Sequence, residues 1–321
     1  MLDRLAGFEE MNTIDRVAVT SRSFSRNPVL RNELLARYAH VTFNDGGLEL
    51  KGDELVRFLD GHDKAITALE RIDETVLASL PRLRVIGKYG VGIDMIDLKA
   101  MRRHGKRLGW TGGVNKRSVA ELTIAFAISM LRHVPASNRE VLQGTWRQHV
   151  GGMLSNRTVG IVGCGYVGKD LVHLLKAFEC KILVHDIQNY AEFYADHGIE
   201  PVDLDDLLLR SDIVTLHVPL NDSTRGMLST VRLNQMKSTA ILINTARGGL
   251  VDEVALKKML RSQRLAAAAF DVFAIEPPED LDLLSLPNFL CTPHIGGSAN
   301  EAILAMGRAA MDGLEINDVP E

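Results

Sequence analysis

The stretch Arg157–Gly168, RTVGIVGCGYVG, limits the fold of this chain more than any other. A short apolar strand, residues 158–162, runs directly into three glycines, and a segment with helical periodicity follows. In such a sequence Gly163 permits a tight turn, Gly165 lets a pyrophosphate approach the backbone, and Gly168 lets the helix pack closely on the strand. The first N–H groups of that helix favour a phosphate. The pattern predicts the strand, turn and helix of a dinucleotide site.

A second strand, KILVH, follows this helix and ends at Asp186. The position is close to the spacing of about 20 residues at which an acidic side chain binds the ribose hydroxyls of NAD. The same carboxylate repels the 2′-phosphate of NADP. The alternative, an ordinary glycine-rich turn, leaves Asp186 unexplained. The sequence therefore predicts a Rossmann-type domain that binds NAD.

The rest of the chain alternates short apolar strands with helical segments. Strands are expected at 16–20, 40–43, 64–68, 84–87, 213–216, 240–244, 266–270 and 288–292, and helices at 28–38, 53–59, 74–80, 118–134, 204–209, 252–260 and 300–314. This alternation predicts an α/β fold of parallel sheets covered by helices on both faces.

The glycine turn lies in the middle of the chain, and a last helix follows the last strand. We therefore expect a Rossmann-type dinucleotide-binding domain inserted into a flavodoxin-like α/β substrate domain. The expected boundaries are 1–112 with 295–321 for the substrate domain and 113–294 for the NAD-binding domain. The active site is expected in the cleft between them.

Composition excludes several other classes of protein. The 321 residues are 46% hydrophobic and 24% charged, as in soluble globular proteins, and the net charge of −4 gives no reason to expect nucleic acid or an anionic membrane as a partner. A basic cluster is interpreted as a solvated helix end; it comprises Arg102, Arg103, His104, Lys106 and Arg107. Residues 1–16 carry charges throughout and predict no signal peptide, and the run LTIAFAISML is too short to span a bilayer. These features predict a cytoplasmic protein.

The three cysteines, Cys164, Cys180 and Cys291, are too few and too scattered for a disulfide framework or a zinc site. We therefore expect buried or incidental thiols in a reducing compartment and no bound metal. Cys164 lies inside the glycine turn, which suggests the hypothesis that its oxidation blocks the cofactor.

The helix expected at Ser118–Val134 is apolar around most of its circumference. Ser118 is followed three residues later by Glu121, and the pair resembles a capping box at the start of the helix. A helix this apolar should pack against two partners, either between the domains or across a dimer interface. The sequence thus suggests a homodimer.

The segment KYGVGIDMID, residues 88–97, follows the strand at 84–87. Gly90 and Gly92 predict a bend with accessible N–H groups at a strand end, where ligands bind in open α/β sheets. Lys88 adds a cation that favours an anionic ligand. A plain turn between strand and helix is the alternative for this segment alone.

Three further polar stretches follow predicted strands; they contain Arg247, Asp271 with Glu276, and His294. A guanidinium matches a carboxylate in two parallel hydrogen bonds and also polarises a carbonyl oxygen. A histidine, with an ordinary pKa of about 6.5, can take the proton of a hydroxyl, and an acid can orient it. Together they suffice for hydride transfer to or from a 2-oxo acid. The structural alternatives are a turn arginine, a solvated turn glutamate, a structural histidine and a turn-capping Asp271.

With these motifs in order, the chain resembles the D-isomer-specific 2-hydroxyacid dehydrogenase family, over roughly residues 88–297. That family includes phosphoglycerate, glycerate, lactate and formate dehydrogenases and glyoxylate/hydroxypyruvate reductases. The resemblance implies that Arg247 is the substrate-binding electrophile, Glu276 the partner of the histidine and His294 the general acid/base. It implies further that the N–H groups of Val91 and Gly92 hold the substrate carboxylate and that Asp271 binds the nicotinamide carboxamide. The implied lining of the NAD site also includes Tyr166, Val167, Pro219, Thr224 and Ala246.

Departures from the family pattern narrow the expected substrate. Lys88 stands where phosphoglycerate dehydrogenases usually carry arginine, so it retains the charge without the forked geometry. Formate dehydrogenases carry glutamine at the position of Glu276, which disfavours formate. The chain ends at Glu321, so no regulatory C-terminal domain is expected. The resemblance implies an NAD-dependent reductase of the glyoxylate/hydroxypyruvate type. A D-3-phosphoglycerate dehydrogenase and an NAD(H)-sensing, corepressor-like interaction protein are the alternatives.

Overall fold

The computed structural model describes residues 11–320. Most of the N-terminal stretch used to predict the lack of a signal peptide lies outside this range. Within it, no single helix has the length and apolar character needed to cross a membrane. The consecutive helices α6 (Lys116–Leu131) and α7 (Val134–Leu142) pass that test only as a pair, bent by 63°.

The chain divides into two compact units. One contains the residues up to Asn115 together with those from Asn300 onward, and the other is Lys116–Ala299. The boundaries expected from sequence were 112/113 and 294/295. In this division the loop that carries His294 belongs wholly to the second unit.

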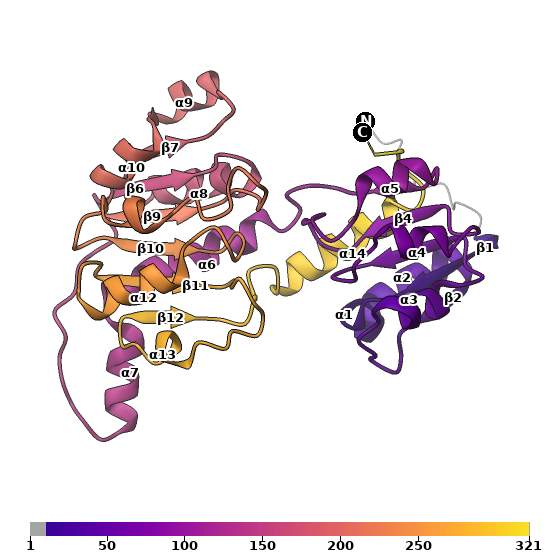
Figure 1. The fold of residues 1–321 in the computed structure, drawn as a ribbon, viewed down its shortest axis with the longest axis horizontal. Coiled ribbons are helices and arrows are strands. Elements are labelled where there is room, and N and C mark those ends of the chain that lie inside the picture. The colour runs from indigo at the N-terminus through magenta and orange to yellow at the C-terminus, as the bar shows by residue number, and fades with distance from the viewer. Residues whose placement is uncertain (1–10, 321) are drawn as a thin grey trace, which may run out of the picture. The chain divides into compact units, whose positions relative to one another are not determined.

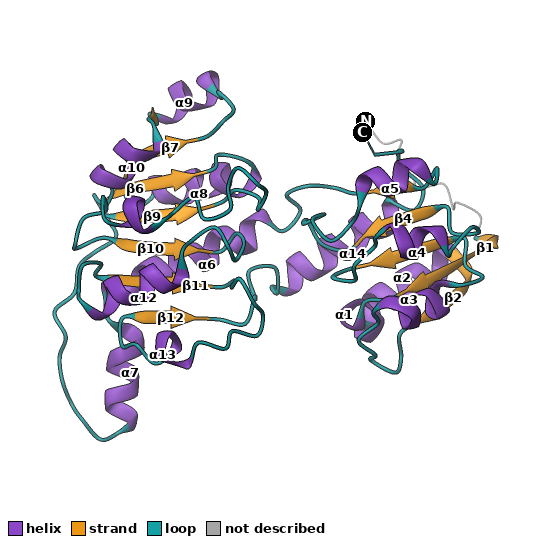
Figure 2. Ribbon diagram, in the orientation of Figure 1, coloured by secondary structure: helices purple, strands orange, loops and turns teal. Residues whose placement is uncertain are grey.

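The first unit is built on a parallel five-stranded sheet in the order β2-β1-β3-β4-β5 (Figures 1 and 2). The strands are β1 (Asn12–Val19), β2 (Tyr38–Phe43), β3 (Lys64–Thr67), β4 (Val85–Lys88) and β5 (Arg107–Gly109). The helices are α1 (Arg22–Arg26), α2 (Pro28–Arg37), α3 (Gly52–Leu59), α4 (Glu74–Ala78), α5 (Leu98–Arg103) and α14 (Asn300–Asp312). Buried side chains form a core on each face of the sheet. This strand order is that of flavodoxin, which confirms the predicted class.

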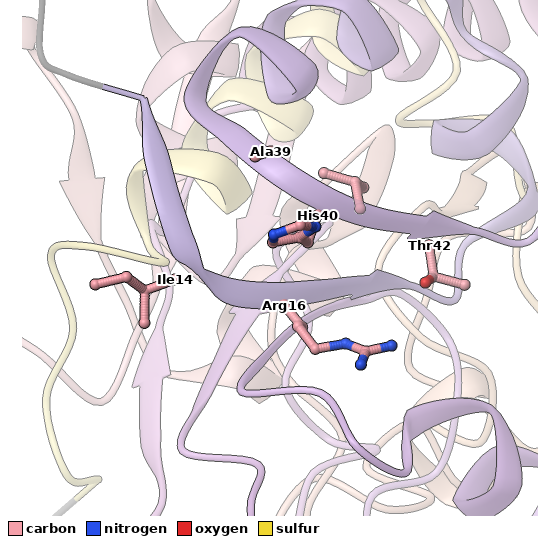
Figure 3. A pocket seen from close by; sticks show the side chains of 6 residues that line it. Ile14, Arg16, Ala39, His40 and Thr42 are labelled. Atoms are coloured by element: carbon pink, nitrogen blue, oxygen red, sulfur yellow. The ribbon is translucent and has the colours of Figure 1, made fainter.

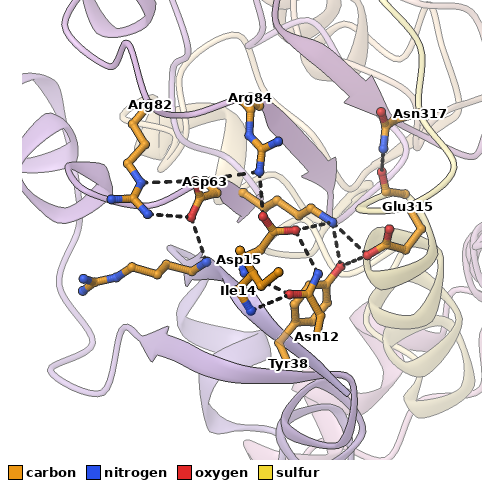
Figure 4. Close-up of polar contacts among 12 residues, drawn as sticks. Asn12, Ile14, Asp15, Tyr38, Asp63, Arg82, Arg84, Glu315 and Asn317 are labelled. Atoms are coloured by element: carbon orange, nitrogen blue, oxygen red, sulfur yellow. Dashed lines mark hydrogen bonds and ion pairs between the residues drawn. The ribbon is translucent and has the colours of Figure 1, made fainter. Parts of the chain in front are cut away.

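A network of charged and polar side chains joins the end of the chain to the sheet of this unit (Figure 4). The ammonium group of Lys64 lies 3.1 Å from Asp15, 2.8 Å from Glu315 and 3.2 Å from the hydroxyl of Tyr38. The Tyr38 hydroxyl in turn donates to Glu315. Lys64 is buried, so its charge is stabilised by these partners and not by water.

The second unit is built on a parallel seven-stranded sheet in the order β12-β11-β10-β9-β6-β7-β8. Its strands are β6 (Thr158–Val162), β7 (Lys181–His185), β8 (Glu200–Pro201), β9 (Ile213–Leu216), β10 (Ile241–Asn244), β11 (Ala267–Phe270) and β12 (Phe289–Cys291). Besides α6 and α7, its helices are α8 (Tyr166–Lys176), α9 (Ala191–His197), α10 (Leu204–Arg210), α11 (Thr230–Leu233), α12 (Glu253–Arg261) and α13 (Leu281–Leu284). The strand order reverses between β6 and β9, as in dinucleotide-binding sheets. The predicted Rossmann-type fold is confirmed.

The predicted capping box of the apolar helix is wrong. α6 begins at Lys116, so Ser118 lies within its first turn and does not precede it. The prediction that this helix packs against two partners holds inside the second unit, where α6 packs against α8 and against β10 and β11. These contacts account for the buried face of α6, whereas Ile128 on the same helix is 36% exposed.

The basic cluster was only partly interpreted correctly. Arg102 and Arg103 are exposed at the end of α5. Lys106, however, is buried, and its ammonium group donates to the main-chain oxygens of Leu80 and Leu83 at 2.7 and 2.6 Å. The long side chain lets the ammonium group bind carbonyl oxygens of the loop between α4 and β4, a role that a run of basic residues does not reveal.

Candidate active site

The glycine turn after β6 has the geometry that its sequence predicts. Gly163 has φ of 97°, and a Cβ there would lie 2.6 Å from a main-chain oxygen at the end of β9, so only glycine fits. A Cβ at Gly168 would lie 2.2 Å from the oxygen of Gly163, whereas one at Gly165 would meet nothing within 4 Å. The N–H groups of Tyr166 and Val167, in the first turn of α8, donate to no acceptor within residues 11–320. This open helix start fits the pyrophosphate of a dinucleotide.

Asp186 lies beside the same turn. Its Oδ2 accepts a hydrogen bond from the Cys164 N–H at 2.5 Å, and its Oδ1 accepts one from the Gln188 N–H at 2.7 Å. Burial, together with the negative charge of Asp186, raises the pKa of the Cys164 thiol to about 11. Because the thiolate is the reactive form, this environment disfavours the hypothesis that oxidation of Cys164 controls cofactor binding.

The remaining residues of the predicted NAD lining lie at the same edge of the sheet. The loop after β9 contains Pro219 and Thr224, and the Thr224 hydroxyl donates to the Pro219 oxygen at 2.7 Å. Ala246 follows β10, and its N–H donates to the side chain of Asn244 at 3.1 Å. Their contacts with NAD stay predictions.

Arg247 follows β10 in a loop that Asn244 organises. The buried Asn244 donates its side-chain N–H to the Arg247 oxygen at 2.8 Å, and the Arg247 guanidinium donates to the Ala246 oxygen at 2.7 Å. Sequence reasoning missed Asn244. The available signal was a polar amide at the end of the apolar strand ILIN.

Glu276 and His294 meet, as predicted. The Nδ1 atom of His294 lies 2.9 Å from Oε2 of Glu276, and the two side chains are 43% and 40% exposed. The other oxygen of Glu276 accepts the Phe273 N–H at 3.1 Å, which fixes the carboxylate. The second nitrogen of the imidazole, Nε2, forms no hydrogen bond within the described residues.

Adjacent parallel strands bring these side chains to one edge of the sheet. Arg247 follows β10, Glu276 follows β11 and His294 follows β12, and these three strands are neighbours in the order β12-β11-β10. Parallel strands end at the same edge, which is also the edge where the glycine turn follows β6. The three chemical groups and the dinucleotide turn thus share one edge of a single sheet.

Asp271 is the residue whose setting differs most from its expected one. Its carboxylate is 1% exposed and accepts three hydrogen bonds from the chain itself, from the Thr292 hydroxyl and from the N–H groups of Ile295 and Gly296. This is the turn-capping arrangement that the sequence left open as an alternative. Binding of the nicotinamide carboxamide by Asp271 stays a prediction.

His217, which follows β9, does not compete with His294 as a proton-transfer group. Burial lowers the pKa of His217 to about 3, and its ring accepts or donates one hydrogen bond with Thr215 at 3.0 Å. His217 is therefore neutral in the working range of most enzymes, as expected of a strand-end residue.

The predicted carboxylate-binding turn lies in the first unit, after β4. The N–H groups of Val91 and Gly92 donate to no acceptor in the described part of the chain, which fits an anion-binding turn. Lys88 is 3% exposed, and its ammonium group donates to the oxygens of Ala68 and Tyr89 at 2.5 and 3.2 Å. Lys88 is thus buried next to the turn, with main-chain oxygens among its partners.

A cavity of about 510 Å³ lies elsewhere in the first unit, along β1 and β2 (Figure 3). It is lined by Ile14, Arg16, Ala39, His40, Val41 and Thr42. None of the predicted site residues lines it, so it has no place in the chemistry considered above.

Comparison with known proteins agrees with the geometry. Residues 124–296 match the family described as D-isomer specific 2-hydroxyacid dehydrogenase, NAD binding domain. The chain belongs to this family. The resemblance inferred from the motifs is confirmed, and the second unit contains the family's NAD-binding domain.

Individual members of the dehydrogenase family are similar over most of the chain. Hydroxypyruvate reductase of Thermotoga maritima is 34% identical over 264 residues, 80% of this chain and 85% of that protein. D-3-phosphoglycerate dehydrogenase of Archaeoglobus fulgidus is 36% identical over 259 residues, 79% of this chain but 49% of that protein. The chain therefore spans about half the length of that relative. The structure of the pyruvate reductase of Chlamydomonas reinhardtii superposes with a TM-score of 0.80 at 27% identity, over 94% of this chain and 95% of that one.

Proposed function

We propose that this protein is an NAD-dependent oxidoreductase that interconverts a small D-2-hydroxy acid and its 2-oxo acid. The observation that carries the proposal is the 2.9 Å contact between His294 and Glu276 at the sheet edge that also carries the glycine turn. A bound NAD supplies the hydride acceptor or donor. Hydroxypyruvate reductase and phosphoglycerate dehydrogenase among the relatives support the substrate class.

Residues of the chain itself transfer the proton and bind the negatively charged carboxylate of the substrate. Glu276 accepts the hydrogen bond of His294 Nδ1, which orients the ring. In the reducing direction the other ring nitrogen donates a proton to the developing alkoxide at C2. The Arg247 guanidinium binds the substrate carboxylate and polarises the carbonyl oxygen. Asp186 favours NAD over NADP because its carboxylate repels a 2′-phosphate.

A substrate screen tests this proposal. The purified protein is mixed with NADH and glyoxylate, hydroxypyruvate, pyruvate or 3-phosphohydroxypyruvate, and NADH consumption is followed by absorbance. We expect turnover of at least one 2-oxo acid, and in the reverse direction oxidation of the D but not the L isomer. Turnover of none of them would contradict the enzyme assignment and favour an NAD(H)-sensing interaction protein. Preference for the phosphorylated acid would identify a phosphoglycerate dehydrogenase.

We also propose that the protein is a homodimer, assembled through α7 and the segment that follows it. α7 buries none of its residues within the chain. Large apolar side chains are exposed along this stretch: Val134, Val141, Leu142, Trp146, Val150 and Met153. Such a run of exposed apolar surface is typical of an interaction site. A monomeric mass by light scattering, unaffected by the substitution Trp146→Glu, would contradict the proposal.

A further inference from the structure

Ser118 does not cap α6, but its hydroxyl has another partner. It donates to the main-chain oxygen of Gly296 at 2.6 Å, although the two residues are 178 positions apart in the chain. Gly296 lies two residues beyond His294, in the loop that follows β12. Ser118 itself contacts neither His294 nor Glu276 through any hydrogen bond, so its effect on them passes through the backbone of this loop.

Asp271 holds the same loop from the other side. Its Oδ1 accepts from the Thr292 hydroxyl at 2.5 Å and from the Ile295 N–H at 2.7 Å, and its Oδ2 accepts from the Gly296 N–H at 2.7 Å. The carboxylate is buried, and hydrogen bonds to a charged acceptor are stronger than neutral ones. Gly296 is thus fixed at its N–H by Asp271 and at its oxygen by Ser118.

The peptide of Gly296 has little space in which to move. A Cβ at Gly296 would lie 3.0 Å from Oδ2 of Asp271 and 3.4 Å from a methyl carbon of Val119, which neighbours Ser118 on α6. The helix and the carboxylate therefore enclose the glycine closely, and a larger residue would require the Asp271 carboxylate to shift by a few tenths of an ångström.

His294 needs this support because its backbone is in an unfavourable conformation. Its φ is 54°, in the left-handed region that residues other than glycine rarely adopt. Its N–H donates to the oxygens of Asp271 and Thr292 at 2.9 and 3.0 Å. A strained residue keeps such a conformation only where its surroundings determine it, and the direction of the His294 ring follows from it.

We propose that Ser118 and Asp271 form a two-sided clamp on the loop 292–298, and that Ser118 is a positioning residue for His294. The clamp keeps the left-handed backbone in place and so holds the imidazole against Glu276 with its second nitrogen directed at the substrate. Because proton transfer requires close alignment, a small displacement of this ring lowers turnover. The kinetic consequences rest on the proposed dehydrogenase function, whereas the clamp itself is a property of the loop.

The experiment compares Ser118→Ala with Ser118→Thr and with the matched control Ser129→Ala. Ser129 lies on the same helix, and its side chain makes no hydrogen bond within the described residues. Amide hydrogen exchange is measured without ligand, and steady-state kinetics with the best 2-oxo acid from the screen. For Ser118→Ala we expect about tenfold faster exchange at Ile295 and Gly296, with no change in β6, because only the clamped loop loosens.

In the same variant we expect kcat to fall about tenfold while KM for NADH is unchanged, because the glycine turn is untouched. Ser118→Thr keeps the hydroxyl and should restore exchange and kcat, and Ser129→Ala should equal the wild type.

Three other results would contradict either the clamp or the proposed dehydrogenase function. Unchanged exchange and kinetics in Ser118→Ala overturn the clamp. Exchange that accelerates equally in β6 shows a general loss of stability and also overturns it. If the wild type turns over none of the acids, the proposed function fails, and the exchange rates alone decide: acceleration confined to residues 295 and 296 supports the clamp, and unchanged rates overturn it.

Discussion

Each unit of this protein contains a carboxylate paired with a basic side chain. The two pairs differ in their burial and in the number of their partners. In the second unit, Glu276 and His294 form a single pair, and about two-fifths of each side chain is exposed. In the first unit, Lys64 is buried, and its ammonium group has Asp15, Glu315 and the Tyr38 hydroxyl as partners. A group that exchanges protons with a substrate must keep one side accessible to it. A buried charge that stabilises the fold instead needs an acceptor for each of its N–H groups.

The largest effect is expected from His294→Ala. Loss of a general acid/base lowers turnover by a factor of 10² to 10⁴, so kcat should fall about 10³-fold, or about 4 kcal/mol of transition-state stabilisation. NAD affinity, measured by calorimetry, should persist because the glycine turn and Asp186 are unaffected. The matched control is His40→Ala in the first unit, an exposed histidine. Near-normal turnover in His294→Ala would contradict the proposal that His294 and Glu276 transfer the proton.

The next largest effect is expected from Lys64→Met, and it concerns stability. Removing one partner from a buried ion pair costs about 3 to 5 kcal/mol, and we expect about 3 because Glu315 is more than half exposed. Native-state hydrogen exchange in β3 and β4 measures this loss. Lys51→Met is the control, since Lys51 and its partner Glu49 are both exposed and such pairs contribute little. Equal effects of the two substitutions would contradict the expectation that a buried ion pair contributes more to stability than an exposed one.

The pH dependence of the first unit follows from the same network. Burial alone would raise the pKa of Asp15, but its hydrogen bonds with Asn12 and Lys64 and the nearby charges of Lys64 and Arg84 lower it. The pKa of Glu315 is lowered in the same way by Lys64 and Tyr38, against the effect of burial. A lowered pKa means stability that is complete above the ordinary value, about 4, and lost as the pH falls through the folded-state value. Lys64→Met should weaken this acid sensitivity.

Glu276→Gln tests the functional pair by charge alone. The Glu276 carboxylate accepts the hydrogen bond of His294 Nδ1 and so orients the ring. Glutamine keeps the size of that side chain and removes its charge, so kcat should fall about tenfold. Steady-state kinetics measure this fall. Glu279→Gln, three residues further along, is the control and should leave kcat unchanged.

The fold could be predicted largely because its signals are local. A tight turn is specified by the glycines at 163, 165 and 168, and a parallel sheet by the apolar strands. The predicted bounds of β6 and β9 equal the observed ones. The pair of His294 and Glu276 was predictable because each follows a strand, and parallel strands end at one edge. Short helices such as α1, α11 and α13 were missed because four or five residues carry too little periodicity.

The rest depended on contacts between distant parts of the chain. A serine followed by a glutamate three residues later is the local signature of a cap, but the Ser118 hydroxyl is used by Gly296. Asp271, Lys88 and Lys106 appeared available for ligands or solvent, yet each is buried against main-chain groups. Sequence identifies a polar side chain, whereas the fold decides whether a ligand or the backbone uses it.

The smallest effect is expected from Tyr38→Phe, which tests whether the buried network tolerates the loss of one member. Tyr38 is 1% exposed, so phenylalanine keeps its packing and removes only the hydroxyl between Lys64 and Glu315. Lys64 and Glu315 remain 2.8 Å apart and still satisfy each other. The free energy of unfolding should therefore fall by only about 1 kcal/mol, the usual value of one hydrogen bond. A loss as large as that of Lys64→Met would show that the network depends on a single hydroxyl.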